Sequence, residues 1–418
     1  MRISTVTMYE QSVNSMNRQQ GEFMKVGQQI ATGRRVVNPS DDPQAASRAV
    51  GVSQAKAVTQ QFADARVSAR NSLSQSESVL NSVSDAITSA KTLMVQAASD
   101  TLSDVDRQSV ASELRGIYET LIGQANATDG NGRYLFGGFK DSSPPFIRDL
   151  EGRVSYVGDE NSRAQRIDAS REMPASDNGA KIFQSVAVGA GYVAEAAKFD
   201  DEGNRTGNNA GNITFRGPQV TDPSADGFGD TFTVIFGGDD AAPTYTLTAV
   251  DSDGIERTLV ADEAYVSGDP IGFDGLSLTL EGSPQPGDSL RVGQAPEMNT
   301  DVFKAFERAL AVLETPAGTP SQKAELRNSL NTTMREFDNS LDNVLTVRAS
   351  VGARLNELDV VDAVGGNRML NYEQTLSDLV DLDYAEAISE YSLRQVGLQA
   401  AQKAFVDIKG LSLFDYLR

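Results

Sequence analysis

Two short stretches of the chain carry residue types that could bind a metal ion or a nucleotide. Asp251-x-Asp253-Gly254 is similar to the start of a calcium loop, because carboxylates alternate with other residues. An EF-hand has its glycine at the sixth position, and here it comes fourth, so we predict a turn. Gly189-x-Gly191 lacks the third glycine and the strand–helix setting of a dinucleotide site. Neither stretch predicts a binding site.

Asp41 and Asp42 form an adjacent carboxylate pair, the residue type that hydrolyses glycosidic bonds. A helix start explains them better. Asp42 is suited to cap a helix, and Pro43 stands where a first helical residue would be. We therefore interpret the pair as structural.

The chain of 418 residues contains no His, no Cys and no Trp. This composition excludes disulfides, Cys/His zinc sites, Ser-His-Asp triads and Cys-His pairs. A metal site would need oxygen ligands alone, and a catalytic site would have to use carboxylates, Lys or Tyr. With no such constellation visible, we predict that the protein is not an enzyme, with no catalytic residues, no metal and no cofactor.

The charge is strongly acidic, with 37 Lys plus Arg against 58 Asp plus Glu and a net charge of −21. Such a chain is unsuited to nucleic acid or an anionic membrane, so we predict neither as a partner. The N-terminus has no unbroken apolar stretch, which argues against a secretory signal peptide. No run approaches the roughly 20 apolar residues of a membrane span.

Composition divides the chain into three parts. Residues 141–297 hold 20 of the 36 Gly, 10 of the 14 Pro and a net charge of −16, whereas residues 1–140 and 298–418 carry +1 and −6. The two outer parts resemble each other more than they resemble the middle. This pattern predicts a domain inserted into a helical framework.

The outer parts have the periodicity of long helices. Residues 52–115 contain no Gly and no Pro, and apolar or small residues recur there at alternating steps of three and four. A helix from Pro43 to about Ser99 would be on the order of 80 Å long. We expect a break between residues 99 and 104, a second helix to about Ala127, and return helices over 302–313 and 326–358 that stop at Gly365-Gly366.

Both ends of the chain carry a narrow heptad stripe, too small to be stable alone. The two stripes are expected to pack along each other or along copies of themselves, or else to belong to an ordinary bundle within one monomer. They predict an assembly interface made of Val6, Tyr9, Val13, Met16, Phe23 and Ile30 at the N-terminus, and Val380, Tyr384, Ala387, Tyr391, Leu398, Ala401, Phe405 and Ile408 at the C-terminus.

The middle part is rich in short β-type segments. Residues 232–236, 244–248, 257–260 and 276–280 contain β-branched and aromatic residues, and Asp253-Gly254 favours a hairpin. Residues 133–136 and 154–157 are expected to form an earlier pair of strands.

These patterns predict an α+β fold: a long antiparallel helical bundle or coiled-coil rod built from both termini, with an inserted β-rich domain. We expect a terminal helical segment from 1–40 and 370–418, a long-helix rod from 41–140 and 298–369, and an outer domain from 141–297.

Three stretches resemble the flagellin superfamily. Ile30 to Ala46, IATGRRVVNPSDDPQAA, is similar to that family's helix, Gly-containing bend and Asp-Asp-Pro helix start. Residues 351–356, VGARLN, resemble its returning helix, and residues 382–388 with 398–403 resemble its C-terminal helix. The resemblance covers about the first 140 and last 120 residues and leaves the middle uncovered.

Within the superfamily, three details are more similar to the hook-associated junction proteins than to flagellin. They are residues 1–5, MRIST, residues 133–138, RYLFGG, and residues 411–417, LSLFDYL. The resemblance implies a structural protein that joins hook to filament, is exported by the flagellar type III apparatus and lies in the extracellular flagellum.

The resemblance also implies partners. These are copies of the chain itself in a ring or helical assembly, the neighbouring hook-associated junction protein, the hook and filament subunits, and a flagellar export chaperone that binds the C-terminal helix. The alternative is a flagellin, the filament subunit. An enzyme would need a carboxylate-only site within residues 141–297.

Overall fold

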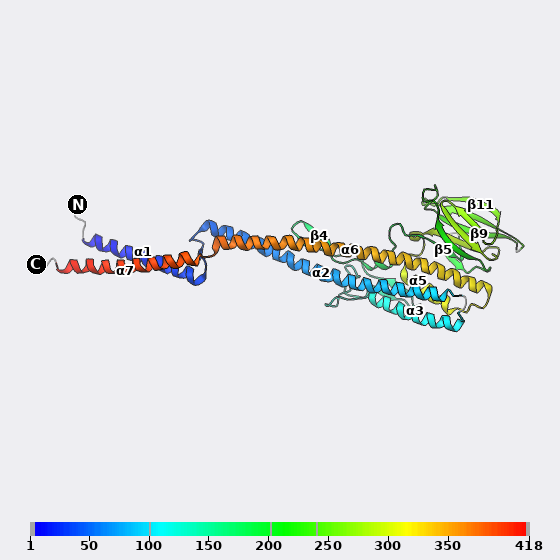
Figure 1. Ribbon diagram of the computed structural model, residues 1–418, viewed down its shortest axis with the longest axis horizontal. Helices are drawn as coiled ribbons and strands as arrows, with labels where there is room; N and C mark the ends of the chain where they lie inside the picture. Colours follow the sequence, from blue (N-terminus) through cyan, green and yellow to red (C-terminus); the bar gives the residue numbers. More distant parts are fainter. Residues whose placement is uncertain (1–4, 100–101, 201–202, 240, 415–418) are drawn as a thin grey trace. The chain divides into compact units, whose positions relative to one another are not determined.

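The computed structural model describes residues 5–99, 102–200, 203–239 and 241–414, and Figure 1 labels its elements. Long helices from both ends of the chain pack on one another, and the chain also contains a β-rich region, so the predicted α+β fold is confirmed. The chain divides into two compact units. Unit 1 contains Met1–Arg66, Ile167–Ala169 and Asp359–Arg418, and unit 2 contains Val67–Arg166 and Ser170–Leu358. None of the described helices is long and apolar enough to span a membrane.

Unit 1 is built from helix α1 (Thr5–Thr32), the start of α2 (Pro43–Ala97), the end of α6 (Pro320–Val380) and α7 (Tyr384–Phe414). The predicted start of α2 is confirmed, because Asp42 Oδ1 accepts a 3.0 Å hydrogen bond from the Ala45 amide. Within this unit α2 and α6 are joined by the ion pair of Lys56 Nζ with Glu373 Oε1 at 2.9 Å.

The predicted stop at Gly365-Gly366 is wrong, since α6 continues without a break to Val380. A β-carbon at Gly365 would lie 2.7 Å from Nη2 of Arg66. The Arg66 side chain is buried, pairs with Asp362 and donates to the Ile167 carbonyl at 3.0 Å. Gly365 therefore makes room for a packed guanidinium, and the helix tolerates the roughly 1 kcal/mol cost of a glycine.

The helices of unit 2 confirm the predicted seam of α2. Buried members run from Ala69 to Ala97, and α2 ends before Ser103 caps α3 (Asp104–Ala125) with a capping box to Asp106. The return helix α5 (Val302–Glu314) packs on α3. Within this unit α2 meets α6 through ion pairs of Lys91 with Asp338 and of Glu77 with Arg348.

An aromatic cluster joins α5 to the short elements that follow α3. The Phe303 ring lies 5.0 Å from the Phe146 ring and 5.7 Å from the Phe183 ring, measured between centroids. Phe146 belongs to β1 (Phe146–Arg148) and Phe183 to α4 (Gly179–Phe183). All three side chains are fully buried, so residues on the β side of the predicted boundary at 141 form part of the helical core.

Phe303→Ala should lower the free energy of unfolding by about 3–5 kcal/mol, because it empties the centre of this cluster. Urea unfolding followed by circular dichroism measures the loss. The matched control is Phe139→Ala, whose side chain is 61% exposed and whose loss should cost less than about 1 kcal/mol. Equal stability losses for the two variants would contradict this account of the core.

The largest β structure is a pair of packed sheets. One has the order β11-β10-β9-β14-β5 and the other β12-β13-β8. Their facing side chains, among them Phe232, Val234 and Leu278, form one buried cluster. The strands are β5 (Tyr192–Ala196), β8 (Thr214–Val220), β9 (Thr231–Asp239), β10 (Ala242–Val250), β11 (Glu256–Ala264), β12 (Pro270–Phe273), β13 (Leu276–Glu281) and β14 (Ser289–Gln294).

The four strands predicted between residues 232 and 280 are confirmed as β9, β10, β11 and β13. The earlier pair is wrong. Residues 133–136 form no strand, and β2 (Val154–Tyr156) pairs instead with β1. The remaining short elements are β3 (Ala164–Asp168), β4 (Arg171–Pro174), β6 (Lys198–Phe199), β7 (Arg205–Gly207) and the 3₁₀ turn η1 (Ala295–Glu297).

Helix α6 presents a buried polar face to the β region. The Asn328 side chain donates a 2.8 Å hydrogen bond to the Ile213 carbonyl. The Thr332 hydroxyl donates to the Ala194 carbonyl at 2.7 Å, and the Asn343 side chain donates to the Lys181 carbonyl at 2.8 Å. These side chains satisfy backbone groups that would otherwise be unpaired. The face consists of Asn328, Ser329, Thr332, Thr333, Glu336, Asn339, Ser340 and Asn343.

Candidate functional site

Helices α1 and α7 lie side by side and antiparallel in unit 1 (Figure 1). Two aromatic contacts fix their register. The rings of Tyr9 and Phe405 are 5.3 Å apart and those of Phe23 and Tyr391 are 4.6 Å apart, between centroids. Glu22 of α1 also pairs with Arg394 of α7. The first alternative for the two terminal stripes, packing along each other, therefore holds within a single chain.

A backbone clip closes one end of this helix pair. The Arg35 amide donates to the Val380 carbonyl at 2.7 Å, and the Leu382 amide donates to the Gly33 carbonyl at 3.0 Å. The Arg35 guanidinium adds a 2.7 Å bond to the Leu379 carbonyl. These bonds tie the two bends, one after α1 and one before α7, to each other.

Gly33→Ala should loosen this clip. The residue has a φ of +68°, and a new β-carbon would lie 2.8 Å from the Tyr384 hydroxyl. A left-handed conformation alone costs an alanine about 1–2 kcal/mol. Amide hydrogen exchange of residues 379–384 should accelerate about tenfold, which corresponds to about 1.4 kcal/mol.

Gly51→Ala is the matched control, because Gly51 lies inside α2 with no atom within 4 Å of the new β-carbon. Alanine is favoured over glycine in a helix by about 0.5–1 kcal/mol. This variant should leave the clip unchanged and stabilise α2. Identical exchange at residues 379–384 in both variants would argue against strain at Gly33.

The structure places the predicted stripe residues unevenly. Ala387 is buried, and Tyr9 and Tyr384 are exposed. Val380 ends α6 rather than lying on α7, because Asp383 caps a new helix. The side chains of Val6 and Ile408 lie outside the described residues. The half-buried members are Val13, Met16, Phe23, Ile30, Val380, Tyr391, Leu398, Ala401 and Phe405.

One buried member of the pair escaped the sequence analysis. Val26 is 5% exposed and falls outside the heptad register chosen there. A globular helix buries three or four positions in every two turns, whereas a strict heptad counts only two. A stripe of that greater width would have included Val26.

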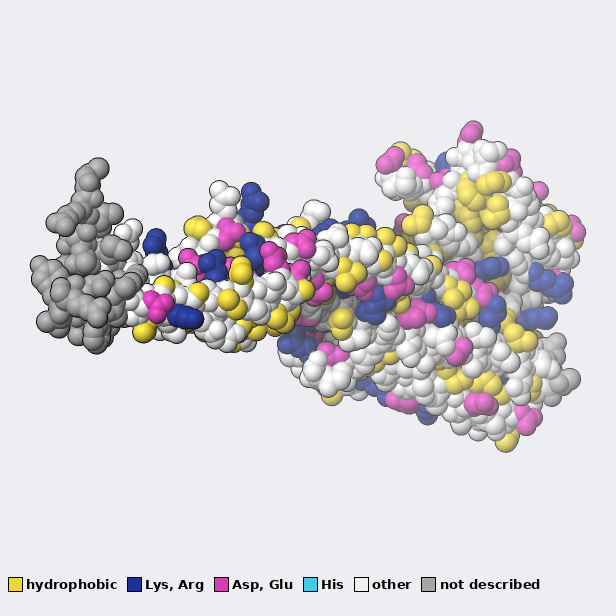
Figure 2. All heavy atoms as spheres, turned by 60° about the vertical axis from the view of Figure 1, so that its left-hand side comes forward, with side chains coloured by type: hydrophobic (Ala, Val, Ile, Leu, Met, Phe, Trp, Pro, Cys, Tyr) yellow, Lys and Arg dark blue, Asp and Glu magenta, His cyan; other side chains and the backbone are white. Residues whose placement is uncertain are grey.

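Several apolar side chains of the pair face away from both helices. Met24 of α1 and Leu393 of α7 are 64% and 71% exposed. On α7 the outward set is Ile388, Leu393, Val396 and Val406. In Figure 2 the hydrophobic side chains lie interspersed among charged ones on the visible face. Helix α7 therefore carries apolar residues on more than its paired side.

Two of the stretches considered for chemistry have structural roles. Asp251 Oδ1 accepts from the amides of Asp253 at 3.0 Å and Ile255 at 2.8 Å, which makes the predicted turn between β10 and β11. The Asn38 amide and the Lys25 ammonium hold the pKa of Asp41 below its usual range. No group of three or more acidic residues is placed to hold a metal in the described parts of the chain.

Comparison with known proteins extends the superfamily resemblance to the whole chain. Residues 3–141 match the bacterial flagellin N-terminal helical region. The chain is 36% identical to flagellar hook-associated protein 3 of Escherichia coli K12 over 99% of both chains, and 34% identical to the Salmonella typhimurium protein of the same name over the full length of both.

The chain belongs to the flagellar hook-associated protein 3 family. Crystal structures agree with this assignment. FlgL of Xanthomonas campestris is 28% identical with a TM-score of 0.64, covering 78% of this chain and 99% of that one. The flagellar junction protein FlgL of Legionella pneumophila, at 23% identity and a TM-score of 0.64 over 80% of this chain and 100% of that one, shares the fold.

Membership in the hook-associated protein 3 family replaces the flagellin and enzyme alternatives. The protein is a structural component of the hook–filament junction, and the family is not enzymatic. Its location is the extracellular flagellum.

Proposed function

We propose that this junction protein assembles through the paired helices α1 and α7, whose outward apolar faces are covered by neighbouring subunits. A junction protein assembles with the subunits of the hook and the filament. Its direct neighbours in this proposal are copies of this chain, arranged in a ring or helical array, and the adjoining hook-associated junction protein. The predicted interface residues and the division into terminal segment, rod and outer domain are part of this proposal.

The carrying observation is the exposure of apolar residues on α7 away from α1. A helix that is apolar on more than one side is normally buried on more than one side. A single partner helix leaves Leu393 and Val396 in water, at roughly 1.5–3 kcal/mol each relative to full burial. Packing in an assembly recovers this free energy.

Before assembly the same surface needs protection. An exposed apolar helix at the C-terminus suits a cytoplasmic export chaperone, which releases it for passage through the type III apparatus. The acidic β-rich part of residues 141–297 then faces the medium.

Labelling of isolated hook–basal bodies tests the place of the protein. Gold-conjugated antibody against this chain should mark a ring at the hook tip, and a strain lacking the gene should carry hooks without filaments while shedding flagellin. Antibody against the hook protein, staining the whole hook, is the control. Gold along the filament would contradict the junction role.

A further inference from the structure

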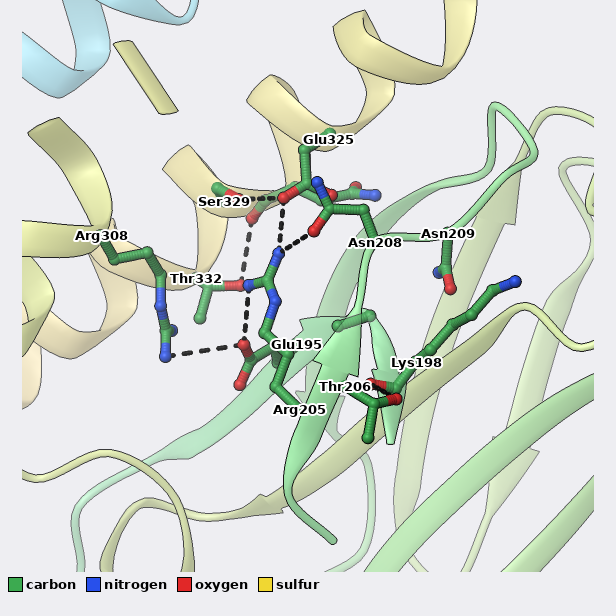
Figure 3. Close-up of polar contacts among 12 residues, drawn as sticks. Glu195, Lys198, Arg205, Thr206, Asn208, Asn209, Arg308, Glu325, Ser329 and Thr332 are labelled. Carbon is green, nitrogen blue, oxygen red and sulfur yellow. Dashed lines mark hydrogen bonds and ion pairs between the residues drawn. The ribbon is translucent and has the colours of Figure 1, made fainter. Parts of the chain in front are cut away.

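Five charged side chains meet where the β region rests on helices α5 and α6, and Figure 3 labels four of them, Glu195, Arg205, Arg308 and Glu325. Arg205 of β7 bonds Glu195 of β5 at 3.1 Å and Glu325 of α6 at 2.6 Å. Arg308 of α5 bonds Glu336 of α6 at 2.8 Å and approaches Glu195 to 3.6 Å. Glu195 therefore links two arginines that come from different layers of unit 2.

The cluster is largely shielded from water. The Glu336 side chain is 2% exposed and that of Glu195 is 14% exposed. The Oε2 atom of Glu336 has no hydrogen-bond partner among the described residues. A buried carboxylate oxygen without a donor strongly disfavours the ionised form.

The charges in the cluster do not balance. Three carboxylates, Glu195, Glu325 and Glu336, face two guanidiniums, those of Arg205 and Arg308. The charged groups acting on Glu336 are Arg308 from α5 and Glu195 from β5, and Glu325 of α6 acts in turn on Arg308. One negative charge is left over unless a proton is bound.

Burial, with a smaller contribution from the Glu195 carboxylate, raises the pKa of Glu336 to about 7, against the opposing effects of the Arg308 guanidinium and the Asn299 side chain. A glutamate in water has a pKa of about 4.3. Glu336 is therefore the group of this cluster that accepts the missing proton.

We propose that the cluster is a proton-linked clasp, in which strands β5 and β7 hold to helices α5 and α6 most tightly when the cluster carries one additional proton. When this contact opens, Glu336 meets water and ionises, so closing takes up a proton. The stabilisation is complete at pH values below the ordinary glutamate range and is lost as the pH rises to about 7. Above about pH 7 the contact between the strands and the helices is at its weakest and no longer changes with pH.

Glu336→Gln tests the clasp in the full-length chain, because the amide has nearly the same shape and no charge at any pH. Hydrogen exchange in β5 and β7 is compared between the native protein and the variant at the same pH. The ratio of the native rate to the variant rate should rise about 30-fold between about pH 5.5 and about pH 8. An unchanged ratio would overturn the proposal.

Glu314→Gln is the matched control, since it removes a carboxylate from an exposed ion pair with Arg115. The ratio of the native exchange rate to the Glu314→Gln exchange rate should stay constant across the same pH range. Should Glu336→Gln fail to fold, Glu195→Gln serves instead. It balances two carboxylates against two guanidiniums, so the native-to-variant ratio should again rise with pH, and a flat ratio would refute the clasp.

Discussion

Leu393→Asp should abolish filament growth on the hook while the monomer keeps its structure. Leu393 is 71% exposed in α7, so an aspartate there is hydrated in the free chain. In the proposed assembly the same side chain is buried, and an unpaired carboxylate in an apolar contact costs several kcal/mol, on the order of a thousandfold or more in affinity per subunit.

Swimming, electron microscopy and the flagellin content of the medium measure this effect, and circular dichroism checks the monomer. Ser392→Asp, at the neighbouring exposed position, controls for added charge and should be tolerated better. Leu398→Asp, in the half-buried seam with α1, should block growth and also loosen the helix pair. Normal filaments with Leu393→Asp would exclude this face of α7 from the assembly.

Removal of residues 192–294 should leave a protein that folds and is exported, whereas removal of 141–297 should not. The ends of the shorter deletion lie together, because Tyr192 pairs with Gln294 in adjacent strands. A few Gly and Ser residues can bridge that gap of about 5 Å. The surface uncovered on α6 is polar, with Asn328, Thr332 and Glu336, so its exposure costs little.

The longer deletion removes Phe146 and Phe183 from around Phe303 and leaves the centre of the aromatic cluster open. Thermal unfolding of the two purified variants, with secretion into the medium as a second measurement, compares them. The shorter variant should unfold cooperatively and support filament growth. If the two deletions are equally stable, the aromatic cluster does not hold the helical core together. If the shorter variant is exported and no filament forms, the β region takes part in the junction.

The local sequence was sufficient to predict the structure wherever a residue's environment depends on residues close to it in the chain. The α2 seam through Leu73, Leu80 and Ile87, the cap at Asp42 and the turn at Asp251 all follow from periodicity or from short side-chain hydrogen bonds. β-branched and aromatic residues likewise located β9, β10, β11 and β13. The matching stripes of α1 and α7 predicted that both terminal helices pack on a partner helix, and left open whether that helix is the other chain end or a copy.

The sequence did not predict which segments pair with each other when they lie apart along the chain. Residues 133–136 and 154–156 are both β-like, yet β2 pairs with Phe146–Arg148, because the edge that a strand meets depends on the packing of the chain between them. The helix also runs through Gly365, since the space it leaves is taken by Arg66, which lies 299 positions earlier.

The polar face of α6 shows most clearly what the sequence alone did not predict. By pattern alone Asn328, Thr332 and Glu336 belong in water, and the apolar stripe beside them marks the core. The tertiary structure buries them because carbonyls of β5 and of the segment before β8 accept hydrogen bonds from Asn328 and Thr332, and Arg308 supplies the countercharge to Glu336. The sequence by itself determined most of the long helices, four strands of the packed sheets and the family. Only the fold decided which polar side chains leave water, because that depends on hydrogen-bond and ion-pair partners that other elements of the structure supply.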